Sequence, residues 1–283
     1  MNTMTEPRTA TYPHAPVGVI DSGMGGLSVL REIRALLPAE ALCYVADSGF
    51  VPYGSRPATE IRNRAETLVR FLLGQQVKAV VVACNTATAA AARSLRDRWP
   101  GLPIVAMEPA VKPAVAATRS GVVGVLATEG TLGSARFAGL LEQYAGRVEV
   151  ITQPCPGLVE AVEQGDLDGP LVGRLLERYL TPLIDAGADT IILGCTHYPF
   201  LRERIREMAG ARLQLIDTGA AVARQLRRRL DEAGLQASVD VSPMHRFWTT
   251  GDPGAMHRFL ARHWPEPEAE VGIVDDDWRR RPG

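Results

Sequence analysis

The sequence predicts an α/β protein made of two similar doubly wound domains that are related by a pseudo-two-fold, with an active site in the cleft between them. Two observations carry this prediction. Short apolar runs alternate with amphipathic stretches along the 283-residue chain, and segments of the first half recur in the second. Alternating strands and helices favour a mostly parallel sheet covered by helices on both faces. The length corresponds to about two domains.

The first half contains four apolar runs that we expect to be strands: residues 16–20, 42–46, 78–83 and 104–106. Apolar residues at helical spacing predict helices at 27–37, 59–73 and 88–99. Thr59 and Glu60 suit the first turn of the second helix. This order of elements is a succession of βαβ units.

The pattern then begins again. Strands are expected at 121–127, 148–152, 190–194 and 213–217, with a short strand at 247–250. Helices are expected from the 128–131 turn to about 144 and at 158–163, 171–186, 200–208, 219–233 and 255–263.

Two segments of the first half have counterparts in the second. Val17 to Ser22 is matched at Val123 to Thr128, and Cys84 with its neighbours is matched around Cys195; the offsets are 106 and 111 residues. The similar offsets indicate two equivalent units. We expect a first domain of residues 16–111 joined by about 222–265, and a second domain of 112–221.

The two ends of the chain lack a folding pattern. Residues 1–15 are polar, contain proline and have no apolar core of a signal peptide, so we expect disorder there. Residues 266–283, with three consecutive aspartates and a terminal arginine run, are expected to be a loose tail.

Charge, the length of the apolar stretches and cysteine content exclude several classes of protein. Lys plus Arg number 31 and Asp plus Glu 32, which argues against a general nucleic-acid binder. No apolar stretch approaches the roughly 20 residues that cross a bilayer, so no membrane association is expected. Four cysteines without a Cys-x-x-Cys pair do not form a disulfide framework, which indicates a reduced, cytoplasmic protein.

Polar residues cluster where the predicted strands end, which is where α/β sheets bind ligands. The segment from Asp21 to Gly26 has three glycines but neither G-x-G-x-x-G nor G-K-[ST]. We interpret these glycines as allowing backbone N–H groups to approach a small anionic ligand.

Cys84 and Cys195 each follow an apolar strand and precede polar residues. A lone cysteine is usually a small buried hydrophobe, and we interpret Cys43 and Cys155 in that way. A thiol just before a helix N-terminus has a lowered pKa and can act as a base. Two opposed thiols predict that one removes a proton while the other delivers one to the opposite face.

Two other classes fit part of this pattern. A two-lobed binding protein for amino acids would need no opposed thiols and would normally carry an export signal. A thiol redox protein would need the two sulfurs within disulfide reach. The sequence does not fix the separation of the sulfurs, so these alternatives stay open at this stage.

Five motifs resemble those of bacterial glutamate racemases, within the aspartate/glutamate racemase family. They are Asp21 to Gly26, Pro52-Tyr53-Gly54, Ala83 to Ala87, Cys155-Pro156, and Leu193 to Pro199. The resemblance runs in one order from about residue 16 to 263, and the Gly-Cys-Thr-His-Tyr-Pro string is its most specific part.

The resemblance implies interconversion of L- and D-glutamate without a cofactor or metal, with D-glutamate feeding peptidoglycan synthesis. It implies that Cys84 deprotonates D-glutamate with help from Asp21. Cys195 would deprotonate L-glutamate with help from His197 and from Glu163, for which Glu160 is the alternative. The implied substrate-binding residues are Asp21, Ser22, Tyr53, Gly54, Asn85, Thr86, Thr128, Thr131, Thr196 and His197.

Three matters stay open beside the resemblance. Asp21 has the ordinary alternative of a helix N-cap, and His197 that of a structural histidine. The loop before Pro-Tyr-Gly, where many members carry an arginine, departs from the pattern with Asp47-Ser48-Gly49-Phe50-Val51. A homodimer is also left open.

Overall fold

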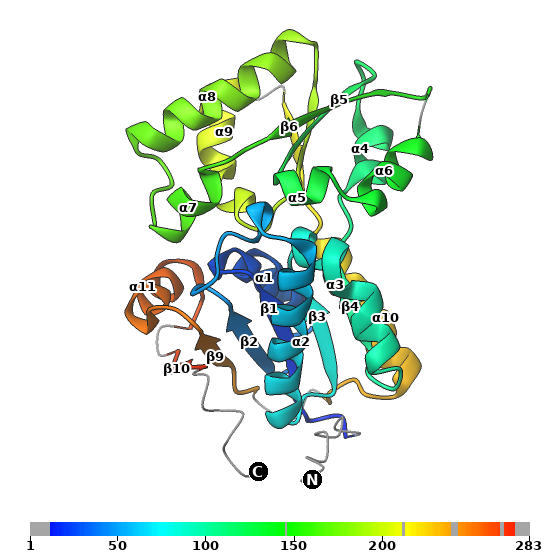
Figure 1. Cartoon of the computed structure of the whole chain (residues 1–283), viewed down its shortest axis with the longest axis vertical. Helices are drawn as coiled ribbons and strands as arrows, with labels where there is room; N and C mark the ends of the chain where they lie inside the picture. Colours follow the sequence, from blue (N-terminus) through cyan, green and yellow to red (C-terminus); the bar gives the residue numbers. More distant parts are fainter. Residues whose placement is uncertain (1–11, 145, 211–212, 239–242, 267–268, 275–283) are drawn as a thin grey trace.

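The computed structural model describes residues 12–274 except 145, 211–212, 239–242 and 267–268. Figure 1 shows two α/β units stacked along the long axis of the molecule, each with its own sheet. We call the unit with the six-stranded sheet the large unit and the unit with the four-stranded sheet the small unit. The prediction of an α/β fold in two parts is confirmed.

All strands of both sheets are parallel. The order in the large unit is β10-β9-β2-β1-β3-β4, and in the small unit it is β6-β5-β7-β8. The large-unit strands are β1 (Val17–Asp21), β2 (Leu42–Ala46), β3 (Ala79–Val82), β4 (Ile104–Ala106), β9 (Arg246–Thr249) and β10 (Val271–Ile273). The small-unit strands are β5 (Val122–Ala127), β6 (Glu149–Pro154), β7 (Thr190–Leu193) and β8 (Gln214–Ile216). In each unit the first four strands in sequence therefore lie in the spatial order second, first, third, fourth.

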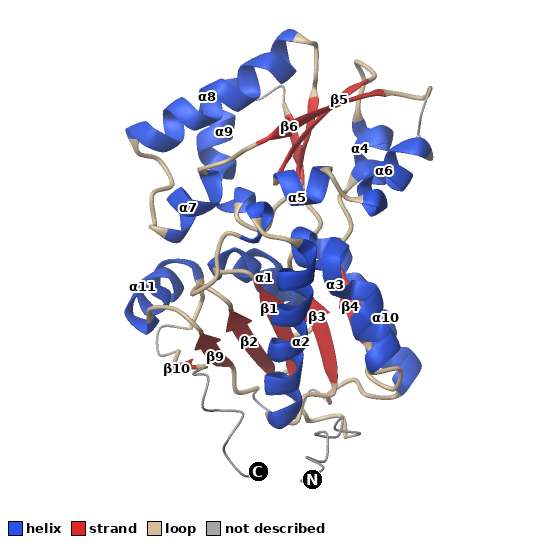
Figure 2. Cartoon of the chain, in the orientation of Figure 1, coloured by secondary structure: helices blue, strands red, loops and turns tan. Residues whose placement is uncertain are grey.

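Helices cover the sheets of both units (Figure 2). The large unit has α1 (Leu27–Leu36), α2 (Ala58–Gly74), α3 (Asn85–Arg98), α10 (Gly219–Ala233) and α11 (Pro253–His263). The small unit has α4 (Val111–Ala117), α5 (Glu129–Leu132), α6 (Ala135–Glu142), α7 (Leu158–Glu163), α8 (Pro170–Asp185) and α9 (Arg202–Ala209). Short 3-10 helices are η1 (Met24–Gly26), η2 (Tyr53–Ser55) and η3 (Tyr198–Leu201). Because α10 packs against α1, and its first residue, Gly219, lies close to Ser28 and Glu32 of α1, we propose a domain division that places the whole of α10, rather than residues from 222 onward, in the large unit.

The repeated Val-Gly-Val motif has the same packing role in both units. A Cβ at Gly18 would lie 2.7 Å from Leu72 of α2, and a Cβ at Gly124 would lie 2.8 Å from Leu183 of α8. Each glycine therefore lets a helix approach the first strand of its sheet closely. The motif that is repeated in the sequence therefore corresponds to the same contact between a helix and the first strand in both units.

Several elements differ from the sequence expectation. Helix α3 begins at Asn85, three residues before the expected start, and α4 was not expected. The helix expected to reach residue 144 is divided into α5 and α6, and Ser134 accepts a hydrogen bond from the Phe137 N–H at the start of α6. Short elements between two periodic segments carry too few apolar positions to be recognised by periodicity.

The two chain ends also differ where the structure describes them. The expected loose tail contains β10, which is paired with β9; a three-residue edge strand is too short to show alternation. Residues 12–15 form a turn closed by the Ala15 N–H and the Tyr12 carbonyl, and Lys78 donates a hydrogen bond to the Pro13 carbonyl. The disorder expected for residues 1–11, and the looseness expected for 267–268 and 275–283, lie outside the described residues.

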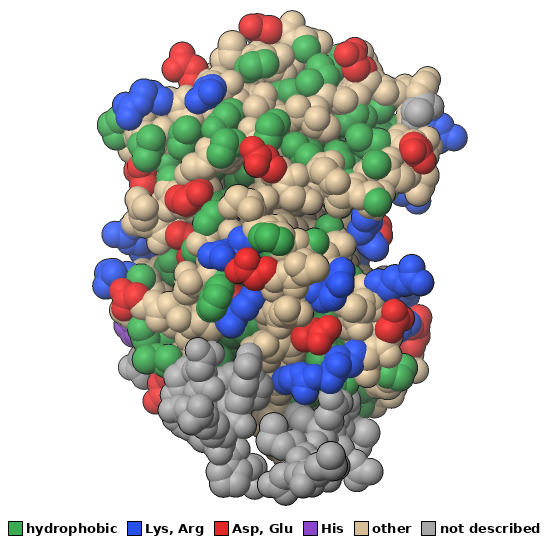
Figure 3. Space-filling view, in the orientation of Figure 1, with side chains coloured by type: hydrophobic (Ala, Val, Ile, Leu, Met, Phe, Trp, Pro, Cys, Tyr) green, Lys and Arg blue, Asp and Glu red, His purple; other side chains and the backbone are tan. Residues whose placement is uncertain are grey.

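The surface carries both signs of charge. On the face in Figure 3, basic and acidic side chains are interspersed over both units. No helix among the described residues is long and apolar enough to span a membrane.

Candidate active site

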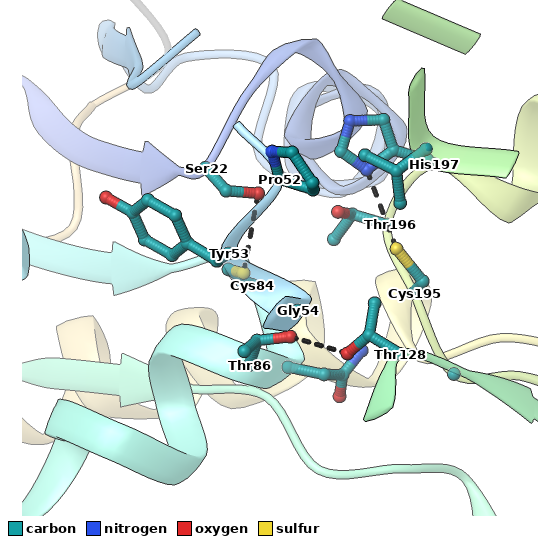
Figure 4. Close-up of a pocket in the computed structure, with 13 residues that line it drawn as sticks. Ser22, Pro52, Tyr53, Gly54, Cys84, Thr86, Thr128, Cys195, Thr196 and His197 are labelled. Atoms are coloured by element: carbon teal, nitrogen blue, oxygen red, sulfur yellow. Dashed lines mark hydrogen bonds between the residues drawn. The ribbon is translucent and has the colours of Figure 1, made fainter. Parts of the chain in front are cut away.

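The carboxyl ends of the strands in the two units meet around one pocket. Cys84 follows β3 and Cys195 follows β7, and both line one small pocket. Figure 4 shows the two thiols on opposite sides of this pocket, each contributed by a different unit. All the predicted site residues except Asp21, Glu163 and Thr131 line it, together with Pro52, Val159 and Gly194.

Cys195 is connected to a histidine and a carboxylate. His197 Nδ1 lies 3.5 Å from the Cys195 sulfur, and His197 Nε2 lies 2.6 Å from Glu163 Oε1. Burial lowers the pKa of His197, but its hydrogen bonds to Cys195 and Glu163 outweigh burial and raise that pKa well above its ordinary value. The imidazole therefore favours its charged form, which places a positive charge beside the Cys195 sulfur.

Glu163, rather than Glu160, contacts the histidine. Glu163 Oε1 also accepts a hydrogen bond of 2.6 Å from the Met24 N–H, and its other oxygen accepts one of 3.3 Å from the Ser48 hydroxyl. Glu160 is exposed, and both glutamates line a neighbouring cavity rather than the thiol pocket. The two donors to Glu163 belong to the large unit, so this carboxylate joins the units.

The glycine-containing segment after β1 packs against side chains of the site itself. A Cβ at Gly23 would lie 2.3 Å from Glu163 Oε1, and a Cβ at Gly25 would lie 2.4 Å from His197 Nδ1. The backbone N–H of Gly26 donates a 2.6 Å hydrogen bond to Asp21. We expected this segment to expose backbone N–H groups to a small anionic ligand. That expectation is wrong for the N–H groups of Met24 and Gly26, because they donate to Glu163 and Asp21.

Cys84 lies at the N-terminus of α3. Its sulfur accepts a 3.4 Å hydrogen bond from the Ala87 N–H and lies 3.7 Å from the Ser22 hydroxyl. Burial, followed by the charge of Asp21, nevertheless raises the pKa of Cys84 well above its ordinary value. The predicted lowering of its pKa is wrong, because the helix N-terminus contributes less than burial does.

Asp21 is itself buried beside Cys84. Besides the Gly26 N–H it accepts hydrogen bonds from the hydroxyls of Thr196 at 3.2 Å and Ser22 at 3.4 Å. Burial raises the pKa of Asp21, against the lowering effect of His197. Asp21 therefore binds the backbone N–H of Gly26 and also lies beside the Cys84 thiol.

A group of amide and hydroxyl side chains completes the pocket. Both polar side-chain atoms of Asn85 are buried without a hydrogen-bond partner among the described residues. Thr86 Oγ1 lies 2.8 Å from Thr128 Oγ1 and 3.2 Å from Thr131 Oγ1. Thr131 thus lies behind the lining and supports the other two hydroxyls. An unpaired buried amide is costly, so Asn85 indicates a polar ligand here.

Tyr53 contributes to the pocket mainly through its backbone. Its ring points away from the pocket in Figure 4, and its hydroxyl donates a 2.5 Å hydrogen bond to Asp47. Gly54 packs so closely on the small unit that a Cβ there would lie 2.8 Å from the Thr128 Cβ. Pro52 and Gly194 lie within recognised motifs, whereas Val159 had no local signal as a pocket residue.

All four cysteines are free. The sulfurs of Cys84 and Cys195 face one pocket from two different units. Cys43 and Cys155 are buried, and burial raises the pKa of Cys43 to about 11. These two thiols have the inert environment expected for them.

The chain is similar in sequence to known proteins. The family described as Asp/Glu/Hydantoin racemase matches residues 17–226. The glutamate racemase of Pseudomonas aeruginosa is 60% identical over 260 residues, which is 92% of this chain and 98% of that protein.

Solved structures give the same result. A glutamate racemase isoform from Bacillus anthracis has a TM-score of 0.84 at 34% identity, covering 94% of this chain and 99% of that chain. The glutamate racemase of Francisella tularensis, solved with D-glutamate, has a TM-score of 0.80 at 29% identity, covering 93% and 98%.

Proposed function

The chain belongs to the Asp/Glu/hydantoin racemase family, as a glutamate racemase, and we propose that it interconverts L- and D-glutamate by a two-cysteine, two-base mechanism without a cofactor. The observation that carries the mechanism is the pair of thiols, one from each unit, on opposite sides of one pocket. The Francisella relative with bound D-glutamate supports glutamate as the ligand.

In each direction of the reaction, one proton is removed from the α-carbon and one proton is added to it. With L-glutamate, the Cys195 thiolate takes the α-proton and becomes a thiol, and the C–H electron pair remains on the substrate. The Cys84 thiol then gives its proton to the opposite face, which yields D-glutamate and a Cys84 thiolate. D-glutamate follows the same steps in reverse, starting from the Cys84 thiolate.

The two thiols obtain help of different kinds. The charged form of His197, held by Glu163, stabilises the thiolate of Cys195. Near Cys84 the described side chains supply no positive charge of this kind, and burial opposes the thiolate. The α-ammonium group of the substrate supplies positive charge inside the pocket, so glutamate itself favours the thiolate there.

The polar lining binds the substrate and stabilises the charge that develops on it. The unpaired Asn85 amide and the hydroxyls of Thr86 and Thr196 are the donors we assign to the α-carboxylate. Preorganised donors of this kind contribute about 2.7–4 kcal/mol each where they meet developing charge. Ser22, the Tyr53–Gly54 backbone and Thr128 are assigned to the side-chain carboxylate.

We place the reaction in the cytoplasm, in the supply of D-glutamate for peptidoglycan. Free thiols at the site are compatible with a reducing compartment.

The experiment follows racemisation by circular dichroism and α-hydrogen exchange in deuterated water, with no added cofactor. Cys84→Ser and Cys195→Ser are expected to lower the rate by orders of magnitude, because a serine hydroxyl is scarcely ionised at neutral pH. Cys43→Ser, which changes a buried thiol outside the pocket, is the matched control. Near-normal activity in either pocket variant would refute the two-base mechanism.

A further inference from the structure

The loop from Asp47 to Gly54, between β2 and α2, carries part of the pocket and touches the small unit twice. At its start the Ser48 hydroxyl bonds Glu163. At its end Gly54 packs against Thr128, and a Cβ at Gly130 would lie 3.0 Å from the Gly54 carbonyl oxygen. The placement of this loop therefore affects both the pocket wall and the contact between the units.

One buried carboxylate fixes the loop from behind. Asp47 is 0% exposed and receives a bidentate pair from Arg64, with Nη2 to Oδ1 at 2.6 Å and Nε to Oδ2 at 2.9 Å. The hydroxyls of Tyr53 and Thr250 donate to the same carboxylate at 2.5 and 2.8 Å. Bidentate arginine–carboxylate pairs are strong and geometrically specific, and one of the other donors belongs to the pocket residue Tyr53.

The same arginine also holds the middle of the loop. The Arg64 guanidinium lies over the Phe50 ring, 3.7 Å from its centre. On the other side of the loop, Arg56 Nε donates a 2.6 Å hydrogen bond to the Phe50 carbonyl. The Gly49 N–H donates to the Thr250 hydroxyl at 3.0 Å. Arg64 thus contacts two loop residues, Asp47 and Phe50, although it does not line the pocket.

We propose that Arg64, acting through Asp47, is a positioning residue that sets the selectivity of the site for glutamate over aspartate. It does so by holding the Tyr53–Gly54 backbone at the distance of the substrate's side-chain carboxylate. This inference rests on the proposed function.

The expected change in the kinetic constants follows from the position of the Asp47–Arg64 pair. The side-chain bonds of the Asp47 carboxylate go to Arg64, Tyr53 and Thr250, whereas the neighbouring Ser48 bonds Glu163. We therefore expect the loss of the pair to weaken substrate binding more than proton transfer. Such a loss raises KM with little change in kcat. Aspartate is one methylene shorter and leaves the distal donors unpaired, which a rigid site penalises strongly. A loosened loop lets those donors move or meet water, so the penalty falls.

The test compares Arg64→Ala, Arg64→Lys and Arg62→Ala. Arg62 is on the same helix, is exposed and donates a hydrogen bond of 3.3 Å to the Ala90 carbonyl, so its variant controls for removing an arginine from α2. We expect Arg64→Ala to raise the KM for glutamate about tenfold with kcat within about threefold. We also expect it to lower the glutamate-to-aspartate ratio of kcat/KM about tenfold. Arg64→Lys should give an intermediate result, because lysine keeps the charge but not the paired geometry.

Thermal unfolding of each variant separates positioning from stability. If Arg64→Ala does not fold, the same comparison is made with Arg64→Lys. An unchanged ratio in the folded variant, or equal losses of kcat for both amino acids, would overturn the inference. A wild-type protein that does not racemise glutamate would instead refute the proposed function, so the two failures are distinguishable.

Discussion

Replacing Glu163 by glutamine is the most informative single change at the Cys195 side. The amide oxygen can still accept hydrogen bonds from His197 and from the Met24 N–H, so the substitution removes charge while keeping the acceptor. The bond to His197 is 2.6 Å long, His197 is 0% exposed and the Glu163 side chain is 10% exposed. Solvent therefore screens this pair only weakly.

The size of the effect follows from the strength of such a bond. Hydrogen bonds to charged groups are worth about 1.5 to 3 kcal/mol, which corresponds to a loss of about 10- to 100-fold in kcat/KM. The loss must be the same in both directions, because a catalyst cannot move an equilibrium between enantiomers. Initial rates by circular dichroism with each enantiomer measure it.

The direction-dependent effect appears in the isotope effects. If Cys195 becomes the poorer acid and base, the step at that thiol limits the rate more. The α-deuterium isotope effect on kcat/KM should then rise for L-glutamate, which Cys195 deprotonates. It should fall toward one for D-glutamate, which Cys84 deprotonates before the slow step.

The pH profile gives a second test with a fixed sign. Although burial acts to lower the pKa of His197, its bonds to Cys195 and Glu163 raise it. Removing the Glu163 charge lowers that pKa, so the charged imidazole is lost at lower pH. The alkaline limb of kcat/KM should therefore move to lower pH.

Glu160→Gln is the matched control for these measurements, because Glu160 lies on the same short helix, is exposed and does not contact His197. Isotope effects that change equally for both enantiomers in Glu163→Gln would contradict the reasoning. A kcat/KM equal to that of the Glu160 variant would do the same.

Three further predictions test other parts of the structure. Asp21→Asn should raise the α-deuterium isotope effect with D-glutamate and not with L-glutamate, and the opposite pattern would assign Asp21 to the other thiol. Gly54→Ala places a Cβ 2.8 Å from the Thr128 Cβ and should raise KM about tenfold with a smaller change in kcat; an unchanged KM would mean that the units do not need this close approach. Lys78→Met leaves the buried Glu40 without its cation and should lower the free energy of unfolding by about 3–5 kcal/mol. Urea denaturation measures that loss, and the folded variant should keep its kcat, because Lys78 lies at the amino end of β3, whereas Cys84 follows its carboxyl end.

Local patterns were sufficient to predict the fold class and the thiol positions. Buried parallel strands are continuous apolar runs, so β1, β3 and β7 and the residues that follow them are visible in the sequence. Cys84 and Cys195 could be selected because each immediately follows such a run. Glu163 and Glu160 could not be distinguished in this way, because their difference lies in the packing of α7 on the large unit.

Features that depend on distant contacts were not predictable. Arg64 lies in an ordinary amphipathic helix, and nothing near it in the sequence indicates its pairing with Asp47. The pKa of Cys84 was predicted in the wrong direction, because the helix N-terminus is a local feature whereas burial depends on the whole fold. The hydrogen-bond partners of the backbone N–H groups in the glycine-rich segment after β1 were likewise unpredictable, since one partner, Glu163, comes from the other unit.

The two carboxylates that we assign to the thiols each accept hydrogen bonds from the other unit. Asp21, on the large unit, accepts a hydrogen bond from Thr196 of the small unit. Glu163, on the small unit, accepts hydrogen bonds from Met24 and Ser48 of the large unit. Separating the units would therefore break the support of both thiols together. This arrangement fits a racemase, because both thiols take part in each turnover. A correctly placed base on one side is not productive unless the acid on the other side is correctly placed as well.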